Sequence, residues 1–245
     1  MQEPKQLQQL QEMVDRSRRI VFFGGAGVST ESGIPDFRSV DGLYNQRYKY
    51  PPEVMLSHSF YVAHTEEFFD FYRTKMLYLD AQPNAAHKKL AELETAGKLT
   101  AVVTQNIDGL HQKAGSRHVY ELHGSVLRNT CQVCGRLYSL DEILRTSGIP
   151  TCSCGGIIKP DVVLYEEPLV ESILSGAIQS IEQADLLVVG GTSLSVYPAA
   201  GLIRYFRGKH LVLINRDSTP YDGNADLLIQ EPIGRVLGNL LVPSL

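Results

Sequence analysis

The chain has 245 residues, a formal net charge of −4 and an apolar content of 43%. This length allows one large domain or a domain with a small insert, and the apolar content is ordinary for a chain that buries a core. The negative charge argues against a protein that binds nucleic acid through bulk positive charge. No stretch holds the roughly 18 apolar residues that a membrane span needs, and residues 1–19 lack the apolar centre of a signal peptide. We therefore expect a cytoplasmic protein with reduced thiols and without nucleic-acid or membrane partners. A monomer is also expected.

The first third of the chain predicts helices and one strand. Apolar residues recur at helical spacing over 5–17, and a short apolar run at 19–23 predicts a strand that ends in glycine. Residues 40–82 show no clear strand, and we interpret them as a loop followed by helices, of which 65–79 is the clearest.

From residue 83 onward, apolar strands alternate with helices. A helix is expected between the start signal at Pro83-Asn84 and the stop signal at Gly97, and a short helix at 106–115. Runs of apolar residues predict strands at 99–106, 118–124, 161–165, 184–191, 210–215 and 225–230. Buried runs of this kind, separated by helices, are typical of a parallel sheet covered on both faces. The predicted fold class is therefore α/β.

The four cysteines lie in one short segment, as Cys131-x2-Cys134 and Cys152-x-Cys154. Two close pairs of thiolates separated by a short loop can bind Zn²⁺ tetrahedrally. Four thiolates leave no open coordination position, which favours one structural zinc ion over a catalytic metal. The alternative is four buried thiols that bind no metal.

Small or polar residues follow five of the predicted strands. The first group resembles the start of a dinucleotide fingerprint, but Thr30 stands where the third glycine belongs, so a plain strand–helix turn is the alternative. Ligands of open parallel sheets bind outside the carboxyl ends of the strands, so five such ends together indicate a nucleotide site. The five ends are Gly25-Ala26-Gly27, Thr104 to Asp108, His123-Gly124, Gly191-Thr192-Ser193 and Asn215.

His123 is the strongest single candidate for a chemical role. A lone histidine is more often structural, but its position at the ligand edge of the sheet favours a general base. The run Asp36-Phe37-Arg38 has two interpretations. It is either a solvated turn with a local ion pair, or a loop that places the Phe37 ring beside a flat heterocycle.

Several motifs together resemble the sirtuins, the NAD-dependent protein deacylases. They are "GAGVSTESGIPDFRS", "TQNID", "ELHG", the cysteine pairs and "GTSLSVYPAA", in that order over nearly the whole chain. The resemblance implies a Rossmann-like NAD-binding domain made of 1–39, 83–128 and 157–245. It also implies a smaller domain, with a cofactor loop and helical module at 40–82 and a zinc-binding module at 129–156. The implied reaction moves an acetyl group from protein lysine to ADP-ribose and releases nicotinamide and free lysine.

The resemblance also implies roles for individual residues. His123 would be the base that activates a ribose hydroxyl, while Asn106 and Asp108 would position the nicotinamide carboxamide and an attacking water. The implied NAD contacts are Gly25, Ala26, Gly27, Thr30, Asp36, Phe37, Arg38, Gln105, Asn106, Ile107, Asp108, Gly191, Thr192, Ser193, Asn215 and Ile233. An acetylated peptide would lie extended as an added strand. Its implied contacts are Val162, Val163, Leu164 and Tyr165 on one side and Val196 and Tyr197 on the other.

The chain departs from the family pattern in its second cysteine pair and in its substrate loop. The pair is C-x-C where C-x-x-C is more usual, and Tyr165-Glu166-Glu167 replaces the common Phe-Gly-Glu, which is compatible with a preference for basic peptides. Sirtuins that remove acidic acyl groups resemble one another in a Tyr-x-x-Arg on a helix of the smaller domain. The nearest equivalent here is Tyr72 and Lys75, while another register places Phe69 and Tyr72 at the two positions. Lysine lacks the planar fork that binds a carboxylate, so we expect a preference for acetyl and other short uncharged acyl groups.

Three other functions remain open at this level. The first is a deacylase that prefers acidic acyl groups. The second is an NAD-binding regulatory module without deacylase activity, which the presence of His123, Asn106 and Asp108 argues against. The third is a zinc-ribbon protein that binds nucleic acid, which the acidic charge balance argues against.

Overall fold

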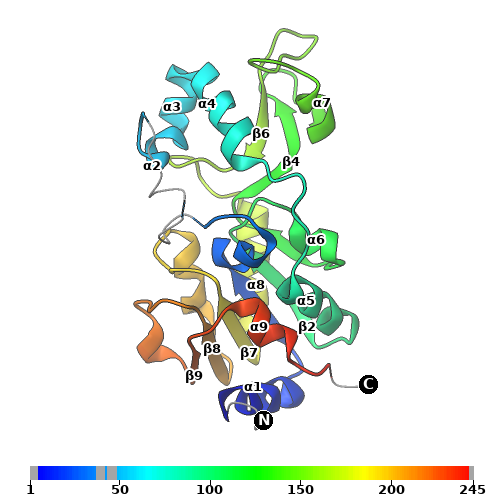
Figure 1. Ribbon diagram of the computed structural model, residues 1–245, viewed down its shortest axis with the longest axis vertical. Coiled ribbons are helices and arrows are strands. Elements are labelled where there is room, and N and C mark those ends of the chain that lie inside the picture. The colour runs from blue at the N-terminus through cyan, green and yellow to red at the C-terminus, as the bar shows by residue number, and fades with distance from the viewer. Residues whose placement is uncertain (1–4, 37–41, 43–48, 243–245) are drawn as a thin grey trace.

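The computed structural model describes residues 5–36, 42 and 49–242, and two sheets of different kinds organise them. The six-stranded sheet and its helices form the larger part of the molecule (Figure 1). The three-stranded sheet lies at the opposite end of the long axis, beside a group of short helices. No helix among the described residues is long and apolar enough to cross a membrane.

The larger sheet is parallel throughout and has the strand order β3-β2-β1-β7-β8-β9. Its strands are β1 (Ile20–Gly24), β2 (Leu99–Thr104), β3 (Val119–Glu121), β7 (Leu186–Gly190), β8 (His210–Ile214) and β9 (Leu227–Ile229). The order reverses between the neighbours β1 and β7, which is where open sheets of this kind bind their ligands. The predicted α/β class is thus confirmed.

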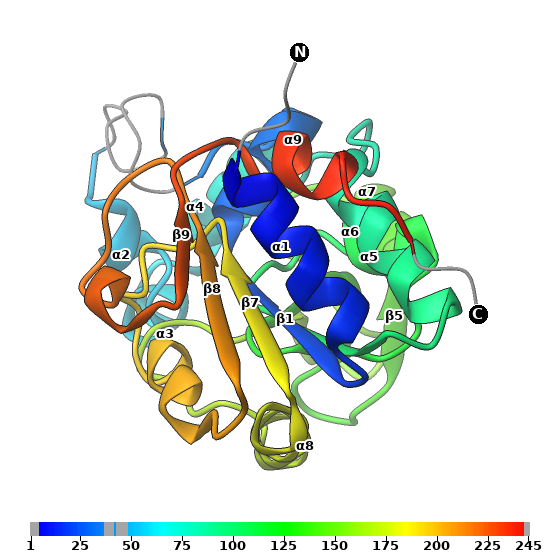
Figure 2. The same ribbon diagram turned by 90° about the horizontal axis from the view of Figure 1, so that it is seen from below.

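Helices cover both faces of this sheet, because alternate side chains of each strand point to opposite faces. Phe22 packs with α1 (Lys5–Arg16), α5 (Ala85–Thr95) and α9 (Ile233–Gly238). Its neighbours Val21 and Phe23 pack on the other face with α8 (Glu171–Gln183) and the 3-10 helix Ala199–Tyr205. Figure 2 shows α1 crossing one face and α8 lying under the other. The short α6 (Leu110–Ala114) follows β2.

The smaller sheet is antiparallel, with the order β5-β4-β6. Its strands are β4 (Gly124–Cys131), β5 (Leu137–Ser139) and β6 (Ile158–Val162). The expectation that a strand at 161–165 joins the parallel sheet is therefore wrong, because β6 pairs with β4 instead. An apolar run has the same appearance in either sheet, so only the tertiary structure decides between them.

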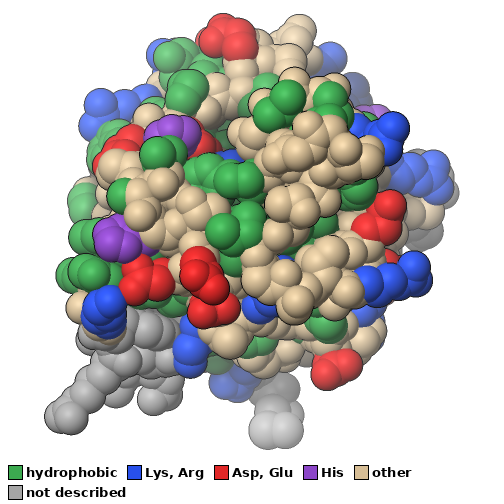
Figure 3. Space-filling model, turned by 90° about the horizontal axis from the view of Figure 1, so that it is seen from above, with side chains coloured by type: hydrophobic (Ala, Val, Ile, Leu, Met, Phe, Trp, Pro, Cys, Tyr) green, Lys and Arg blue, Asp and Glu red, His purple; other side chains and the backbone are tan. Residues whose placement is uncertain are grey.

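Short helices complete this end of the molecule: α2 (Pro52–Met55), α3 (His58–Ala63), α4 (Thr65–Phe71), the π-helical turn Tyr72–Met76 and α7 (Leu140–Leu144). The predicted helix at 65–79 is thus shorter than expected and changes its winding after Phe71. Acidic and basic side chains are interspersed on this end of the molecule (Figure 3). The predicted domain division remains a proposal, and β4 and β6 mark where the chain passes between the two sheets.

The first prediction concerns Gly124, which joins the two sheets. Its φ is +75°, and a β carbon there would overlap the carbonyl oxygen of Asp161 in β6. We expect Gly124→Ala to lower the free energy of unfolding by at least about 3 kcal/mol, because it adds a clash with backbone to an unfavourable φ. The measurement is urea unfolding followed by circular dichroism.

Gly97→Ala is the matched control. Its φ is +69°, but no atom lies within 4 Å of the position of its β carbon. This substitution carries the backbone cost alone, about 1 kcal/mol. Equal losses in the two variants would show that the contact between β4 and β6 tolerates a side chain, and would contradict the prediction.

Candidate active site and metal centre

A cavity of about 790 Å³ lies at the carboxyl edge of the parallel sheet and continues to the small sheet. All predicted NAD and peptide contacts within the described residues line this cavity, and so does the predicted base. They are Gly25, Ala26, Gly27, Thr30, Asp36, Gln105, Asn106, Ile107, Asp108, His123, Val162, Val163, Leu164, Tyr165, Gly191, Thr192, Ser193, Val196, Tyr197, Asn215 and Ile233. The predicted contacts Phe37 and Arg38 lie outside the described residues.

The backbone turns that follow β1 and β7 are in close contact. The amide of Gly27 donates to the carbonyl oxygen of Gly191 over 2.8 Å. A β carbon at Gly27 would lie 2.8 Å from the Gly191 α carbon, and one at Gly25 would lie 2.9 Å from the Thr192 β carbon. Only glycine allows this approach, and the resulting turns border the cavity with backbone and no bulky side chain. Such an edge suits the phosphates of a nucleotide.

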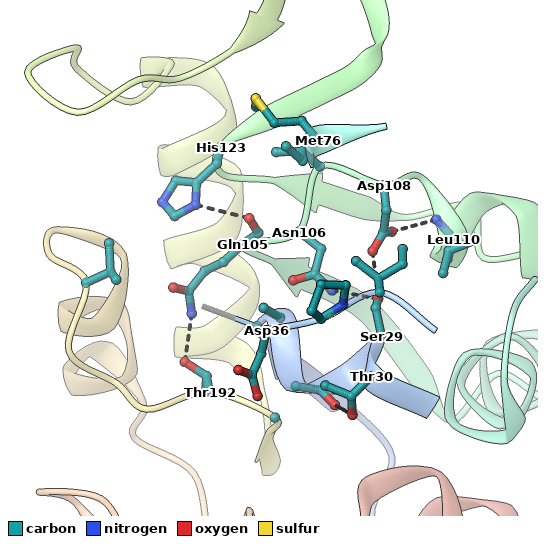
Figure 4. A pocket seen from close by; sticks show the side chains of 18 of the residues that line it. Ser29, Thr30, Asp36, Met76, Gln105, Asn106, Asp108, Leu110, His123 and Thr192 are labelled. Atoms are coloured by element: carbon teal, nitrogen blue, oxygen red, sulfur yellow. Dashed lines mark hydrogen bonds between the residues drawn. The ribbon is translucent and has the colours of Figure 1, made fainter. Parts of the chain in front are cut away.

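A chain of hydrogen bonds joins the carboxyl ends of β8, β7 and β2. The Asn215 Oδ1 accepts from the Thr192 amide over 3.0 Å. The Thr192 Oγ1 accepts from the Gln105 Nε2 over 3.1 Å (Figure 4) and from the Leu194 amide over 3.2 Å. These bonds hold polar side chains from three separate strands at fixed positions on one wall of the cavity.

Ser29 organises the two polar side chains that follow β2. Its Oγ donates to the Asp108 Oδ2 over 2.6 Å and accepts from the Asn106 Nδ2 over 3.1 Å (Figure 4). The Leu110 amide binds the other Asp108 oxygen over 2.9 Å. The carboxylate and the carboxamide therefore reach the cavity with fixed orientations. Sequence reasoning missed Ser29, although it lies within the first motif and is buried.

His123 lies between the two sheets and has one ring nitrogen engaged. Its Nδ1 lies 3.0 Å from the Gln105 carbonyl oxygen (Figure 4), and because a carbonyl only accepts, Nδ1 carries the proton. The Nε2 atom is then left with a lone pair. Burial lowers the pKa of His123 below its usual 6.5, while the bond to Gln105 raises it by less. A neutral imidazole beside a cavity, with its tautomer set by the backbone, is suited to act as a general base.

The segment after β6 forms the wall of the cavity nearest the small sheet. The Val163 amide donates to the His123 carbonyl oxygen over 3.0 Å, which ties this wall to the candidate base. Along this segment, Val162 and Leu164 are buried, Val163 is half-buried and Tyr165 is exposed. Tyr197, on the opposite wall, is also exposed. Two walls of this kind leave room for an extended chain between them.

The four cysteine sulfurs lie together, all within 4.8 Å of one another. The Cys131 and Cys154 sulfurs are 3.5 Å apart and those of Cys134 and Cys152 are 3.6 Å apart. These distances exceed the roughly 2.05 Å of a disulfide and are close to the about 3.8 Å that separates sulfurs at 2.3 Å from a tetrahedral zinc ion. The four thiols thus fit one structural Zn²⁺, as predicted, and the C-x-C spacing does not prevent convergence.

The surroundings of the cluster favour the thiolate form of two of the four cysteines, Cys131 and Cys152, whose pKa values are lowered. The Gly156 amide lowers the pKa of Cys154, but the other three thiols raise it by more. The Cys154 amide and then the Tyr138 hydroxyl, which donates to the Cys152 sulfur over 3.0 Å, lower the pKa of Cys152 to about 5. Cys131 and Cys152 belong to the hydrophobic core beside the three-stranded sheet, together with Phe68 and Ile158. A zinc ion here would therefore crosslink the strands and loops that carry this core.

Comparisons with known proteins agree with this geometry. The model of the Sir2 family matches residues 25–198. An NAD-dependent protein deacetylase of Clostridium acetobutylicum is 59% identical over 239 residues, which cover 96% of this chain and 98% of the relative. A solved Sir2 complex with p53 peptide and NAD⁺ is 39% identical, with a TM-score of 0.83 and coverage of 94% and 95% of the two chains. Another, with deacetylated p53 peptide and 3'-O-acetyl ADP-ribose, is 38% identical, with a TM-score of 0.87 and coverage of 95% and 96%.

The second prediction concerns the metal. We expect about one Zn²⁺ per chain and expect Cys131→Ala to abolish its binding. The loss should lower the free energy of unfolding by at least about 3 kcal/mol, because metal binding contributes directly to the stability of small zinc modules. Metal analysis and thermal unfolding measure the two effects.

Ser153→Ala is the control, since Ser153 is exposed and stands between two of the ligands. It should keep both the metal and the stability of the parent chain. Purified protein with well under one zinc ion per chain, yet with unchanged stability, would contradict a structural metal.

Proposed function

The chain belongs to the Sir2 family, and from this premise we propose that it removes acetyl groups from protein lysine side chains in a reaction that consumes NAD. Acetyl-lysine, NAD and water give lysine, nicotinamide and O-acetyl-ADP-ribose. The observation that carries the proposal is the shared cavity, in which glycine turns, a neutral histidine and a fixed carboxamide–carboxylate pair meet between two sheets.

The parallel sheet would bind NAD through the residues at its carboxyl edge. The turns at Gly25–Gly27 and Gly191–Ser193 would receive the phosphates, as their close backbone contact supports. Asn215 and Ile233 would flank the adenosine end, and Asn106 and Asp108 the nicotinamide end. NAD supplies the ADP-ribosyl group that accepts the acetyl group. The proposed contacts of Phe37 and Arg38 rest on the family resemblance alone.

His123 would accept a proton at Nε2 from a ribose hydroxyl, since its Nδ1 already donates to Gln105. Asn106 and Asp108 would hold the carboxamide and a water molecule in place, with Ser29 fixing both side chains. A positioned base of this kind contributes roughly 10²- to 10⁴-fold to a rate. The peptide would lie between Val163 and Val196.

The walls near the π-helical turn support an uncharged acyl group. Tyr72 is fully buried in the small-domain core, and its hydroxyl lies 3.3 Å from the carbonyl oxygen of Val126. It does not line the cavity, so it is not placed to bind a substrate carboxylate together with Lys75. Lys75 does line the cavity, but the side chains beside it, such as Met76 and Ile107, are apolar. Burying a carboxylate among them without a full set of partners would be costly.

The alternative functions have less support. A regulatory module without catalysis would not need the ordered His123, Asn106 and Asp108. A protein that binds nucleic acid is expected to carry a basic surface. Here the net charge is −4, and acidic and basic side chains are interspersed on the face in Figure 3. The cytoplasmic location and the monomeric state stay predictions of the sequence.

The third prediction tests the activity and the base together. Nicotinamide release from NAD should require an acetyl-lysine peptide and should be negligible with the unmodified peptide. His123→Ala should lower deacetylation by at least about 10²-fold but retain more of the exchange of free nicotinamide into NAD, because that step does not need the base. Equal loss of both activities would contradict the assigned role.

The pH dependence follows from the direction of the His123 shift. Burial lowers the pKa of this imidazole, so the neutral, active form persists at pH values below its usual 6.5. Deacetylation should fall only as the pH drops through that lowered pKa. If lowering the pH already abolished activity with a midpoint above pH 7, this result would contradict His123 as the base.

The fourth prediction concerns the acyl group. On one peptide that carries each acyl group in turn, kcat/KM should be at least about tenfold higher for acetyl-lysine than for succinyl-lysine, given the cost of burying an unpaired carboxylate. Succinyl turnover equal to acetyl turnover would contradict this prediction and would identify Lys75 as an unexpected carboxylate partner.

A further inference from the structure

Glu166, in the segment between β6 and α8, has an unusual backbone conformation. Its φ is +75°, in the left-handed region that favours glycine. Among the described residues other than glycine, only Leu194 shares a positive φ. This chain therefore holds the conformation with a residue that carries a β carbon, for which it is unfavourable. Some compensating interaction is needed to hold it.

The Glu166 carboxylate supplies that interaction through Ser59, which lies 107 residues earlier in the chain. Its Oε2 accepts from the Ser59 amide over 2.9 Å, and its Oε1 accepts from the Ser59 hydroxyl, also over 2.9 Å. Ser59 is the second residue of α3, where amides lack a partner inside the helix. Both carboxylate oxygens thus bind one residue in a clasp, a term that we keep for these two bonds.

Neighbouring bonds extend the clasp into a short interface between two segments, 56–59 and 165–167. The Tyr165 amide donates to the Leu56 carbonyl oxygen over 2.9 Å, and the His58 amide donates to the Tyr165 carbonyl oxygen over 3.0 Å. The Glu167 carboxylate lies 2.9 Å from the His58 Nδ1. The clasp is therefore the outermost part of a contact that fixes residues 163–167, the cavity wall nearest the small sheet, to α3.

The clasp also fixes the position of one backbone N–H donor, the amide of Glu166 itself. The amides of Val163, Leu164 and Tyr165 all donate within the protein, to His123, to the Glu167 carboxylate and to Leu56. The Glu167 amide donates to the Leu164 carbonyl oxygen. Within this described segment, the Glu166 amide alone has no acceptor in the protein, and Glu166 lines the cavity. An extended peptide that adds to this wall would need such a donor.

We propose that Glu166 is a positioning residue: its carboxylate clasps Ser59 and so holds the wall at 163–167, with the Glu166 amide, ready to bind the main chain of the substrate peptide. This role rests on the proposed deacetylase function. It differs from direct attraction of basic peptide residues by the Glu166 charge, because both carboxylate oxygens are already engaged by Ser59. Loss of the clasp affects peptide binding and leaves the chemistry at His123 unchanged.

The test compares three substitutions at Glu166 and one at Ser59 in the full chain. Glu166→Ala removes the clasp and keeps the unfavourable φ, whereas Glu166→Gly removes the clasp and relieves the φ. Glu166→Gln removes the charge but retains an oxygen that can accept from the Ser59 amide. Glu182→Ala is the matched control, since it removes one acidic charge from an exposed position on α8. The readouts are KM for peptide, KM for NAD and kcat, on a neutral and on a Lys-rich acetylated peptide.

The clasp predicts that Glu166→Ala and Glu166→Gly both raise the peptide KM about five- to tenfold, the effect of losing partly exposed hydrogen bonds to a charged group. The kcat and the KM for NAD should change less than about twofold, because these bonds touch neither NAD nor the base. Glu166→Gln should stay within about threefold of the parent on both peptides, since one bond persists. Ser59→Ala should raise the peptide KM too, with little further effect in combination with Glu166→Ala.

Three results would overturn the proposal. A Glu166→Gly variant with the parent KM would show that only the backbone conformation matters. Losses confined to the Lys-rich peptide, and as large in Glu166→Gln as in Glu166→Ala, would show a direct charge contact. Unchanged KM values in all variants would show that the clasp has no role in binding.

A readout that does not need activity separates this proposal from the proposed function. Hydrogen exchange at the Ser59 amide should be faster in Glu166→Ala than in the parent chain and should keep the parent rate in Glu182→Ala, because the Glu166 carboxylate is the acceptor of that amide. If no acetyl-lysine-dependent turnover is found in the parent chain, the proposed function fails while this exchange result still reports on the clasp. Unchanged exchange in Glu166→Ala contradicts the clasp itself.

Discussion

The close contact between the turns after β1 and β7 is the constraint on which the site depends. These two strands are neighbours at the point where the strand order reverses, and their turns meet backbone to backbone at Gly27 and Gly191. A side chain at either position would push the turns apart and fill the edge of the sheet. Because neither carries one, the carboxyl ends of the strands stay open, and the network from Asn215 through Thr192 to Gln105 can form across them.

The second constraint is the passage between the two sheets at His123 and Gly124. The Gln105 carbonyl oxygen, after β2, accepts a hydrogen bond from the His123 ring, and the His123 carbonyl oxygen accepts one from the Val163 amide in the segment after β6. One residue thus connects the nucleotide edge of the parallel sheet to the surface that would bind the peptide. This arrangement explains why the candidate base lies at the junction of the sheets and why Gly124, which must approach β6 closely, follows it.

Much of the site could be predicted from the sequence because parallel strands bring their carboxyl ends to one edge, whatever their exact register. The residues after β1, β2, β7 and β8 therefore converge as expected. The cysteine pairs converge because the pairing of β4 with β6 places Cys131 beside Ile158, which follows the second pair. The sheet to which β6 belongs was not predictable, since its apolar run fits either sheet. Ser29 was missed because a serine in a glycine-rich turn has the same appearance whether it caps the backbone or holds Asp108. The contact of Glu166 with Ser59 is invisible in the sequence, because it joins distant segments by side chain alone.

The most direct measurement of the central claim is the stoichiometry of the products. With an acetyl-lysine peptide and NAD, mass spectrometry should find nicotinamide, deacetylated peptide and O-acetyl-ADP-ribose in equal amounts, because the acetyl group moves to the ribose rather than to water. Free acetate formed while NAD stays intact would contradict the account. Plain ADP-ribose formed from NAD while the peptide keeps its acetyl group would contradict it equally.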